Sequence, residues 1–467
     1  MTFPRTVHPN DTPDTPTFQI RANGKDINPE YQVLSMVVTR AANRIASADI
    51  ILQDGNPAEE NFDVSSSSDF VPGAEVEIQM GYSSKNTTVF KGIIVRHSVK
   101  VRINQSALLC ISCRDKAVKL TVGRNHAFFE KQKDSDIIQK LIKGKGLNAS
   151  VSSTSLTHPQ MVQYNSTDWD FILSRADANG MLVFTEDGKI TVEKPKLEGP
   201  AVSVLYGASI ISFDAEMDAR YQYAGAKASA WDSATQKIIS GKGTKPSALS
   251  PGNITASKLA GIIGLSDLPL VHGGQVKSEE LKEWASAQML KSELSKIRGK
   301  VRFQGLGKVK PGDTIELGGV GSRFSGKAFV SGVRHEFDNL NWETEVSFGM
   351  DPSWFHEQFE NIVDTQASGL IPAINGLTIG IVTKLESDPD GEDRVQVTIP
   401  SIDPNAKVSG RVLQAWTQEN NAAVFPGLKS TTKWCWVSQR RSAQSGDTRP
   451  TPQQQKPRAG KSKRYQP

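Results

Sequence analysis

Two cysteines separated by two residues are the first side chains of this chain that could do chemistry. Cys110 and Cys113 have the C-x-x-C spacing found in redox motifs and zinc sites. They lie in a strand-like run, however, where positions i and i+3 point to opposite faces. No second cysteine pair and no suitably spaced histidine completes a four-ligand zinc site. We therefore interpret both as ordinary strand residues and expect no metal site.

A glycine-rich stretch from Gly321 to Lys327 comes close to the phosphate-binding P-loop. Its sequence is followed by Ala328, where a P-loop needs Ser or Thr to hold magnesium. The residues on both sides are strand-like, whereas a P-loop joins a strand to a helix. The stretch therefore predicts a hairpin connection, and we expect no cofactor.

His356 and Glu357 begin a near match to the H-E-x-x-H motif of zinc proteases. Glu360 stands where the second histidine should be, and Pro352 leaves room for only a short helix. A solvated helix end explains this motif better than a metal site does.

Paired carboxylates offer the last candidate chemistry. The pairs Asp168/Asp170 and Asp388/Asp390 are better explained as helix-capping and turn residues than as the catalytic carboxylates of a glycosidase. The chain has no G-x-S-x-G motif, and its seven histidines are scattered. We predict that the protein is not an enzyme and has no catalytic residues.

Composition indicates a multidomain globular protein of 467 residues, with 37% hydrophobic residues and 38 glycines. The formal charge of +5 comes from the end of the chain. Residues 427–467 hold ten basic residues and one acid, which leaves 45 basic against 49 acidic residues before them. The body is therefore mildly acidic, and a nucleic-acid interpretation would depend on the tail alone.

Neither a signal peptide nor a membrane span is recognisable in the sequence. Residues 1–5 lack a basic region followed by an apolar run, and no stretch approaches about 18 consecutive apolar residues. Three cysteines do not make a disulfide framework. We expect synthesis in the cytoplasm without a signal peptide.

Alternating runs and helical spacing predict the elements that must position these residues. The alternating runs predict strands at residues 33–39, 47–52, 75–80, 89–97, 107–112, 300–303, 313–317, 327–335 and 342–348. Helical spacing predicts helices at residues 134–144, 167–179 and 279–298. Asp134 or Ser135 would cap the first helix, Thr167 would cap the second, and Gly299 would end the third. A hairpin turn at Asp187 and Gly188 follows the second helix. Strands, short helices and strands again predict an α+β, β-dominated fold.

A second strand set follows a linker at residues 361–372. Residues 377–385, 394–399 and 411–416 are strand-like, which is how a small barrel of the oligonucleotide/oligosaccharide-binding (OB) type could open. After Phe425 the sequence turns polar, basic and low in complexity.

Residues 163–180 carry the most specific pattern of the chain. They read Gln-Tyr-Asn-Ser-Thr-Asp-Trp-Asp-Phe-Ile-Leu-Ser-Arg-Ala-Asp-Ala-Asn-Gly and resemble the signature of VgrG, the valine-glycine repeat spike of type VI secretion. Ser166 and Trp169 depart from that signature, and Arg175 sits one place late. The resemblance implies that eight residues have a structural role in the hub fold: Tyr164, Thr167, Asp168, Trp169, Asp170, Phe171, Arg175 and Gly180.

Residues 90–92, 309–313 and 376–383 match further VgrG motifs in family order, so the resemblance covers residues 20 to 426. It implies a tailed-phage baseplate hub of two barrel-like domains with inserted helices, followed by a small, incomplete OB-type barrel. The implied division is a flexible arm (1–20), a first hub domain (21–130), an α/β insertion (131–200), a second hub domain with a long helix (201–360), a linker (361–372), an OB spike base (373–426) and a basic tail (427–467).

VgrG-like proteins are homotrimers at the tip of a contractile injection machine. The resemblance implies that this chain adapts the tube to the spike, nucleates assembly and delivers a tip protein and effectors into target cells. Its implied partners are the tube protein, baseplate and sheath components, a PAAR-like tip protein and effectors, with no specific nucleic acid and a target membrane pierced mechanically. The implied destination is outside the cell. The machine would be a type VI apparatus, a phage tail or an extracellular injection particle.

The resemblance breaks after Phe425, where a VgrG would close its OB barrel. With permitted codon choices, residues 427–437 shifted back by one base, and residues 436–449 shifted forward by one base, read as family-like sequence. We hypothesise single-base slips near codons 427 and 437, in the gene or in its recorded sequence. The same reading frame in independently sequenced DNA would rule out a sequencing error.

Two other functions stay open from the sequence. The first is an OB-type nucleic-acid-binding protein anchored by its basic tail, which is disfavoured because the OB-like segment has few aromatic residues interleaved with Lys or Arg. The second is a tail-associated, cell-wall-degrading enzyme, for which the short linker leaves no obvious place.

Overall fold

The computed structural model describes residues 15–103, 105–232, 235–274, 276–338, 341–359, 362, 378–384, 395–399, 403–410 and 435–437. The chain divides into two compact units, Met1–Val363 and Asp364–Pro467. Strands dominate the described residues, which confirms the predicted α+β, β-dominated class. None of the described helices has the length and apolar character of a membrane span.

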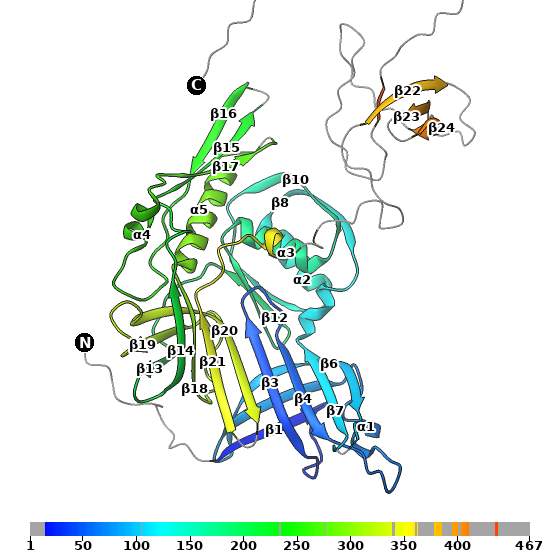
Figure 1. Cartoon of the computed structure of the whole chain (residues 1–467), viewed down its shortest axis with the longest axis vertical. Helices are drawn as coiled ribbons and strands as arrows, with labels where there is room; N and C mark the ends of the chain where they lie inside the picture. The colour runs from blue at the N-terminus through cyan, green and yellow to red at the C-terminus, as the bar shows by residue number, and fades with distance from the viewer. Residues whose placement is uncertain are drawn as a thin grey trace, which may run out of the picture. The chain divides into compact units, whose positions relative to one another are not determined.

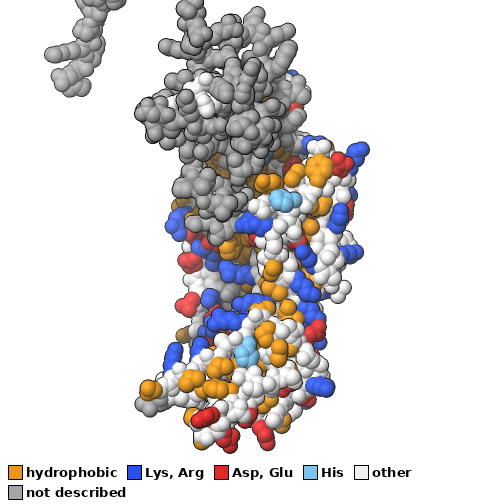
Figure 2. Space-filling view, turned by 90° about the vertical axis from the view of Figure 1, so that its right-hand side faces the viewer, with side chains coloured by type: hydrophobic (Ala, Val, Ile, Leu, Met, Phe, Trp, Pro, Cys, Tyr) orange, Lys and Arg blue, Asp and Glu red, His pale blue; other side chains and the backbone are white. Residues whose placement is uncertain are grey.

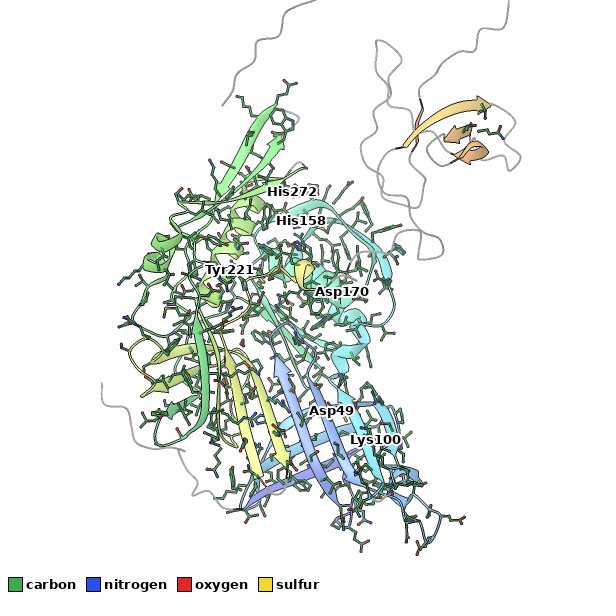
Figure 3. All side chains as sticks on the ribbon, viewed as in Figure 1. Asp49, Lys100, His158, Asp170, Tyr221 and His272 are labelled. Carbon is green, nitrogen blue, oxygen red and sulfur yellow. The ribbon has the colours of Figure 1, made fainter. Side chains whose placement is uncertain are left out.

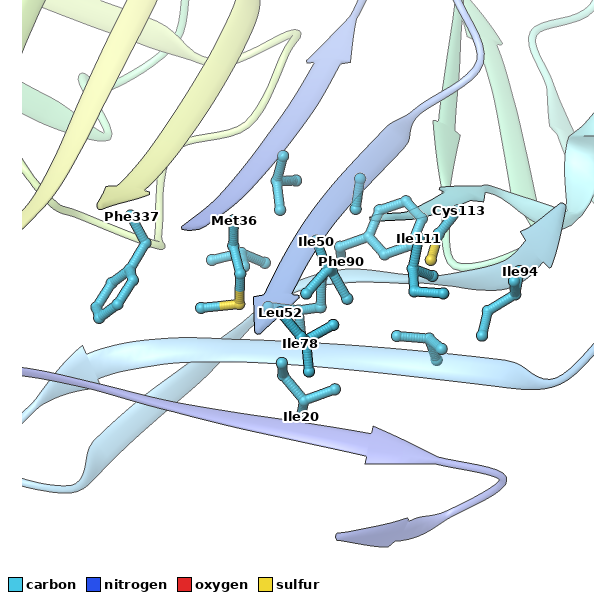
Figure 4. Close-up of a cluster of buried hydrophobic side chains, with 14 of the residues drawn as sticks. Ile20, Met36, Ile50, Leu52, Ile78, Phe90, Ile94, Ile111, Cys113 and Phe337 are labelled. Atoms are coloured by element: carbon cyan, nitrogen blue, oxygen red, sulfur yellow. The ribbon is translucent and has the colours of Figure 1, made fainter. Parts of the chain in front are cut away.

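A curled antiparallel sheet encloses the first core of the larger unit. Its elements are β1 (Pro16–Ala22), β2 (Lys25–Asp26), β3 (Val33–Ala41), β4 (Ser47–Gln53), β5 (Glu75–Tyr82), β6 (Lys85–Lys100) and β7 (Leu108–Arg114), with the short helix α1 (Asp63–Ser66). Alternation turns every second side chain inward, as with Met36 and Val38 on β3. Figure 4 shows these buried side chains, among them Ile50, Phe90 and Phe337, inside the curl. Their burial, about 1.5–3 kcal/mol for each large side chain, holds the strands together.

The same sheet continues into a second strand set. The added strands are β13 (Val202–Leu205), β14 (Ile210–Met217), β18 (Ile297–Gln304), β19 (Thr314–Gly318), β20 (Gly326–Asp338) and β21 (Asn341–Phe348). Within the described residues the order is β14-β18-β21-β20-β3-β4-β7-β6-β5-β1-β2. Off this open path, β19 pairs with β20, and β13 pairs with β19.

Strand β20 joins the two halves of this sheet. Its residues 332–338 pair with β3, and Figure 1 shows β20 and β21 beside β3. Phe337 packs into the first core, whereas Val330 and Val333 pack into a second core around Phe303. The two cores therefore share one long hairpin.

An α/β insertion separates the two strand sets in the chain. It contains the 3-10 helix η1 (Lys116–Leu120), β8 (Asn125–Lys133), α2 (Asp134–Gly144), β9 (Asn148–Val151), β10 (Thr157–Ser166), α3 (Asp168–Ala178), β11 (Leu182–Glu186) and β12 (Lys189–Glu193). Ile138 of α2 and Ile172 of α3 share a core with Val183 and Ile190 of the β11–β12 hairpin. That hairpin turns through positive φ at Asp187, as the Asp-Gly pair predicts.

A second helical layer covers a three-stranded sheet. Its elements are β15 (Ala226–Asp232), β16 (Lys237–Lys242), α4 (Ala256–Ile263), β17 (Leu268–His272) and the long helix α5 (Ser278–Ser295), and α6 (Phe355–Gln358) follows later in the chain. Leu281 and Ala285 of α5 pack on Ala226 and Ala228 of β15, whose small side chains let the helix approach closely.

The smaller unit contains β22 (Thr378–Lys384), β23 (Val395–Ile399), β24 (Asp403–Gly410) and β25 (Cys435–Val437). Strands β22 and β23 are antiparallel, which confirms the predicted strands at 377–385 and 394–399. The predicted strand at 411–416 lies outside the described residues, as do the linker apart from Ile362 and most of the tail. The OB barrel stays a prediction.

Three details of the sequence interpretation are wrong. Strand β1 begins at Pro16, inside the stretch expected to be a flexible arm, because it pairs with β5. Helix α5 ends at Ser295, and Gly299 belongs to β18. Asp134 does not cap α2, whose N-cap is Lys133. The carboxylate of Asp134 belongs instead to the buried cluster described below.

Candidate functional site

Thr167, the first polar residue of the signature helix, caps α3. Its Oγ1 accepts a hydrogen bond from the backbone N–H of Asp170 at 3.0 Å, as the sequence predicts. Asp170 itself lies at the half-buried surface of the first turn, where its charge suits the positive end of the helix dipole.

Asp168 ties α3 to the neighbouring elements. It is buried, and its Oδ1 accepts hydrogen bonds from the side-chain amides of Asn125 on β8 and Gln163 on β10, both at 2.9 Å. The Nζ atom of Lys145 lies 3.2 Å from its Oδ2. These partners satisfy a carboxylate that would be costly to bury alone.

The two aromatic residues at the start of α3 face different cores. Trp169 joins the core formed by α2, α3 and the β11–β12 hairpin. Phe171 stacks on Phe129 of β8, with 6.0 Å between ring centroids. Helix α3 is therefore held on both sides, by the hairpin and by the β8–β10 ribbon.

Arg175 forms the centre of a buried polar cluster. Its Nε and Nη2 donate to Oδ1 and Oδ2 of Asp134 at 2.7 and 2.9 Å. Asn179 Nδ2 donates to Oδ2 of the same carboxylate at 2.8 Å, and His158 Nε2 lies 3.0 Å from it. We name these four residues, Asp134, His158, Arg175 and Asn179, the Asp134 cluster. It joins α2, β10 and α3.

The charges of the Asp134 cluster stabilise each other. Burial alone would raise the pKa of Asp134, but hydrogen bonds from His158 and Arg175 outweigh it and hold this pKa well below its usual range. Burial acts to lower the pKa of Arg175, and Asp134 overcomes this and raises it. Both residues are therefore charged at neutral pH.

Gly180 and Tyr164 complete the signature residues. Gly180 has φ of 65°, and a Cβ there would lie 3.3 Å from Ala287 and Leu290 of α5, so glycine serves both the turn and the close approach. Tyr164 is 51% exposed and stacks edge-on against His126, with 5.0 Å between ring centroids. The structure thus gathers the other seven signature residues on and around α3 and leaves the Tyr164 ring at the surface.

The Asp134 cluster resembles the Asp–His part of a catalytic triad, but its chemistry is different. Within the described residues, His158 Nε2 hydrogen-bonds to the carboxylate of Asp134, which Arg175 and Asn179 already hold, and its side chain reaches no hydroxyl or thiol nucleophile. The arrangement can hold three elements together and keep a carboxylate ionised. Sequence reasoning missed His158 and Asn179, and only Arg175 carried a signal.

The other chemical candidates lie in structural positions. Cys110 and Cys113 are free thiols on β7, and burial raises the pKa of Cys113 to about 12, with Asp49 adding to the effect. In the part of the chain that the structure describes, no group of three His, Cys, Asp or Glu residues could hold a metal ion. Residues 321–325 lie in the connection between the antiparallel strands β19 and β20, and Gly326 and Lys327 begin β20, which confirms the predicted hairpin. His356 lies in the four-residue helix α6.

Solved structures with a similar fold include two tail proteins. The 43 kDa tail protein of prophage MuSo2 from Shewanella oneidensis has a TM-score of 0.54 and 14% identity, over 72% of this chain and 98% of that chain. The tail protein from Neisseria meningitidis MC58 has a TM-score of 0.52 and 14% identity, over 73% of this chain and 98% of that chain. The E. coli c3393 protein, described as a component of the type VI secretion system, has a TM-score of 0.47 and 13% identity, over 82% and 89% of the two chains.

No curated protein sequence matches this chain. The likeness to the two tail proteins confirms the hub-like fold that the VgrG resemblance predicted. A family model described as the Alg8 N-terminal domain matches residues 12–339, which is well over half of the 467 residues. The chain therefore belongs to the Alg8 N-terminal domain family.

Proposed function

We propose that this chain is the structural hub and spike base of a contractile injection apparatus, and that it works as a homotrimer at the tip of the tube. The observation that carries this proposal is the likeness to the MuSo2 tail protein, which extends over 98% of that protein. In the proposed role the chain adapts the tube to the spike, nucleates assembly and carries a tip protein and effectors out of the cell.

Exposed apolar side chains near the end of β6 support an assembled state. Val95 and Val99 are partly exposed, and Val101 and Ile103 beyond the strand are 67% and 90% exposed. Figure 2 shows several apolar side chains at the lower end of the face that it draws. A neighbouring subunit would bury this patch, which favours a role in subunit contact.

The use of the buried polar groups supports a mechanical role. The charged groups of Asp168 and of the Asp134 cluster bond to neighbouring helices and strands and hold these elements together. The similar solved structures are tail proteins rather than enzymes. We therefore propose that the protein has no catalytic activity of its own.

The division of the chain is part of the proposal. We propose two hub domains (21–130 and 201–360) around the insertion (131–200), with residues 373–426 as an incomplete OB spike base. The basic residues 427–467 would then replace the closing strands because of the single-base slips proposed above.

Deletion of the gene in the organism or phage that encodes it tests this function. We expect electron micrographs to show no assembled sheathed particles, and we expect a plasmid copy to restore them. Sheathed particles of normal number and length in the deletion strain would contradict the proposal.

Replacement of the exposed apolar residues beyond β6, Val101 and Ile103, tests the assembly surface. We expect the double variant Val101→Asp/Ile103→Asp to fold but to lose the trimer in size exclusion. Val122→Asp is the matched control, because Val122 is 70% exposed and lies beyond η1 rather than next to β6. A trimer that survives in the double variant would show that subunit contact uses another surface.

A further inference from the structure

A cavity of about 180 Å³ lies between α3 and the first turns of α5. Its wall combines aromatic and apolar side chains with a set of charged groups. The lining residues are Leu156, Ala178, His272, Val276, Trp284, Asp134, Arg175, Asn179, Glu280 and Glu283. Figure 3 labels His272, which lines this cavity, beside His158, which contacts Asp134.

Helix α5 presents one aromatic ring and two carboxylates to the cavity. Glu280, Glu283 and Trp284 are spaced by three and four residues, so they share one face of the helix. The ring of His272 packs edge-on against Trp284, with 6.4 Å between centroids and 86° between planes, and so helps to hold the indole in place. An indole next to carboxylates is a surface that attracts a cation.

The charges that line the cavity are not balanced. Three carboxylates, of Asp134, Glu280 and Glu283, face the single guanidinium of Arg175. Arg175 gives two hydrogen bonds to Asp134, and its Nη2 forms a longer ion pair with Glu280 at 3.6 Å.

Glu283 has a partner outside the cavity, Lys194, at 3.2 Å. The Lys194 side chain is mostly exposed, and such surface pairs contribute little and are readily exchanged. The carboxylates of Glu280 and Glu283 therefore have capacity for another cation.

We propose that this cavity binds an alkylammonium or alkylguanidinium group. This chemistry is shared by a free organic amine and by a lysine or arginine side chain of a partner protein. The volume corresponds to about six water-sized groups. It fits the five heavy atoms of n-butylammonium, with the alkyl part against Val276 and the charge beside Trp284 and the two glutamates.

Titration of the full chain, labelled with fluorotryptophan, with n-butylammonium and n-butylguanidinium tests the proposal. The chain has eight tryptophans, and the fluorine resonance that disappears in Trp284→Phe identifies the reporter. We expect this resonance to shift with millimolar affinity, as is usual for such small ligands. We expect neutral n-butanol to bind at least about tenfold more weakly.

Charge variants separate the cavity from the helix around it. We expect Glu280→Gln/Glu283→Gln to weaken n-butylammonium binding by about tenfold or more, and Glu279→Gln to change it by less than about twofold. Glu279 is the matched control, because it lies in the same exposed first turn and does not line the cavity. If the double variant unfolds, the single variant Glu283→Gln, which loses only a surface ion pair, gives the same test with a smaller effect.

Blocked tripeptides with a central lysine or arginine distinguish the two sources of the ligand. Binding about tenfold tighter than that of the free amine would identify a partner side chain, and equal binding would identify a small amine. The proposal is overturned if n-butanol and n-butylammonium bind equally, if neither shifts the Trp284 resonance, or if Glu279→Gln weakens binding as much as the double variant does.

Discussion

The strand sheet and the helical insertion bury polar groups in opposite ways. In the sheet, His335 on β20 is fully buried, its Nδ1 lies 3.0 Å from Oγ1 of Thr344, and burial lowers its pKa to about 3, with Arg40 adding to the effect. In the insertion, Asp134 is equally buried but stays charged, because hydrogen bonds from His158 and Arg175 hold its pKa below the usual range. One region buries a neutral group, and the other buries a charge with its partner.

This difference determines which perturbation destabilises each region. The His335 site depends on the absence of a proton, so it is sensitive to mild acid. The Asp134 cluster depends on the presence of Arg175, so it is sensitive to loss of that side chain. Four substitutions test this contrast, beginning with the largest expected effect.

Removal of the Arg175 guanidinium should lower the free energy of unfolding the most. Arg175→Ala leaves the buried Asp134 carboxylate with hydrogen bonds from His158 and Asn179 but without its guanidinium partner, and loss of one partner of a buried ion pair costs about 3–5 kcal/mol of unfolding free energy. Urea unfolding at pH 7 measures it. The double variant Asp134→Ala/Arg175→Ala should lose less than the single one, because no charge is left unpaired.

The pair of Arg220 and Asp218, whose guanidinium lies at the surface, supplies the control for this comparison. Arg220 is mostly exposed, so we expect Arg220→Ala to leave the unfolding midpoint unchanged. Equal destabilisation by Arg175→Ala and Arg220→Ala would contradict the importance assigned to the Asp134 cluster.

Acid should act next, through His335. Its pKa is about 3 in the folded chain against about 6.5 when unfolded, so only the unfolded chain takes up a proton between these values. Stability should therefore fall by about 1.4 kcal/mol per pH unit as the pH drops below 6.5, or about 2 kcal/mol by pH 5. The variant His335→Gln should flatten this slope in urea unfolding at pH 7, 6 and 5.

The Asp134 cluster should not contribute to that slope. The pKa of Asp134 is lowered on folding, so its stabilisation is complete above the unfolded value of about 4 and is lost only at lower pH. His126→Gln, at an exposed position, is the control for the histidine substitution. An unchanged slope in His335→Gln would show that another group titrates between pH 7 and 5.

Loss of the helix cap should have a smaller effect. Thr167→Ala leaves the N–H of Asp170 without its acceptor at the start of α3 and should cost about 1 kcal/mol in thermal or urea unfolding. Thr167→Ser keeps the hydroxyl and should keep most of the stability. If the Ser variant is as unstable as the Ala variant, packing of the Thr methyl group is responsible instead of the cap.

The surface ion pairs of the sheet should matter least. Lys300 Nζ lies 2.9 Å from Glu345 Oε1 at an exposed position, so Lys300→Ala should cost about 0.2–1 kcal/mol at low salt. The difference from wild type should vanish at high salt, where exposed charges are screened. A loss comparable to that of Arg175→Ala would remove the contrast between buried and exposed pairs.

Local patterns in the sequence predicted much of the fold. Alternation located β3 to β7 and β18 to β21, and the cap at Thr167 and the turn at Gly180 located α3. These features depend on residues close in sequence, so the chain itself displays them.

Long-range partners explain what the sequence could not predict. Asp134 looks like a helix cap until Arg175, 41 residues later, is placed beside it. His335 lies between Arg334 and Glu336, so nothing local indicates its burial on the strand between β3 and β21. Gly299 looks like a helix end, yet it pairs with Phe348 in the sheet. Of the cavity between α3 and α5, the sequence shows only the shared helix face of Glu280, Glu283 and Trp284.

The mass of the full chain in solution tests the proposed hub most directly. The protomer has a mass of 50.9 kDa. Light scattering coupled to size exclusion should give about 150 kDa, the mass of a closed three-fold assembly. A single species of 50.9 kDa at every protein concentration would contradict the trimeric hub.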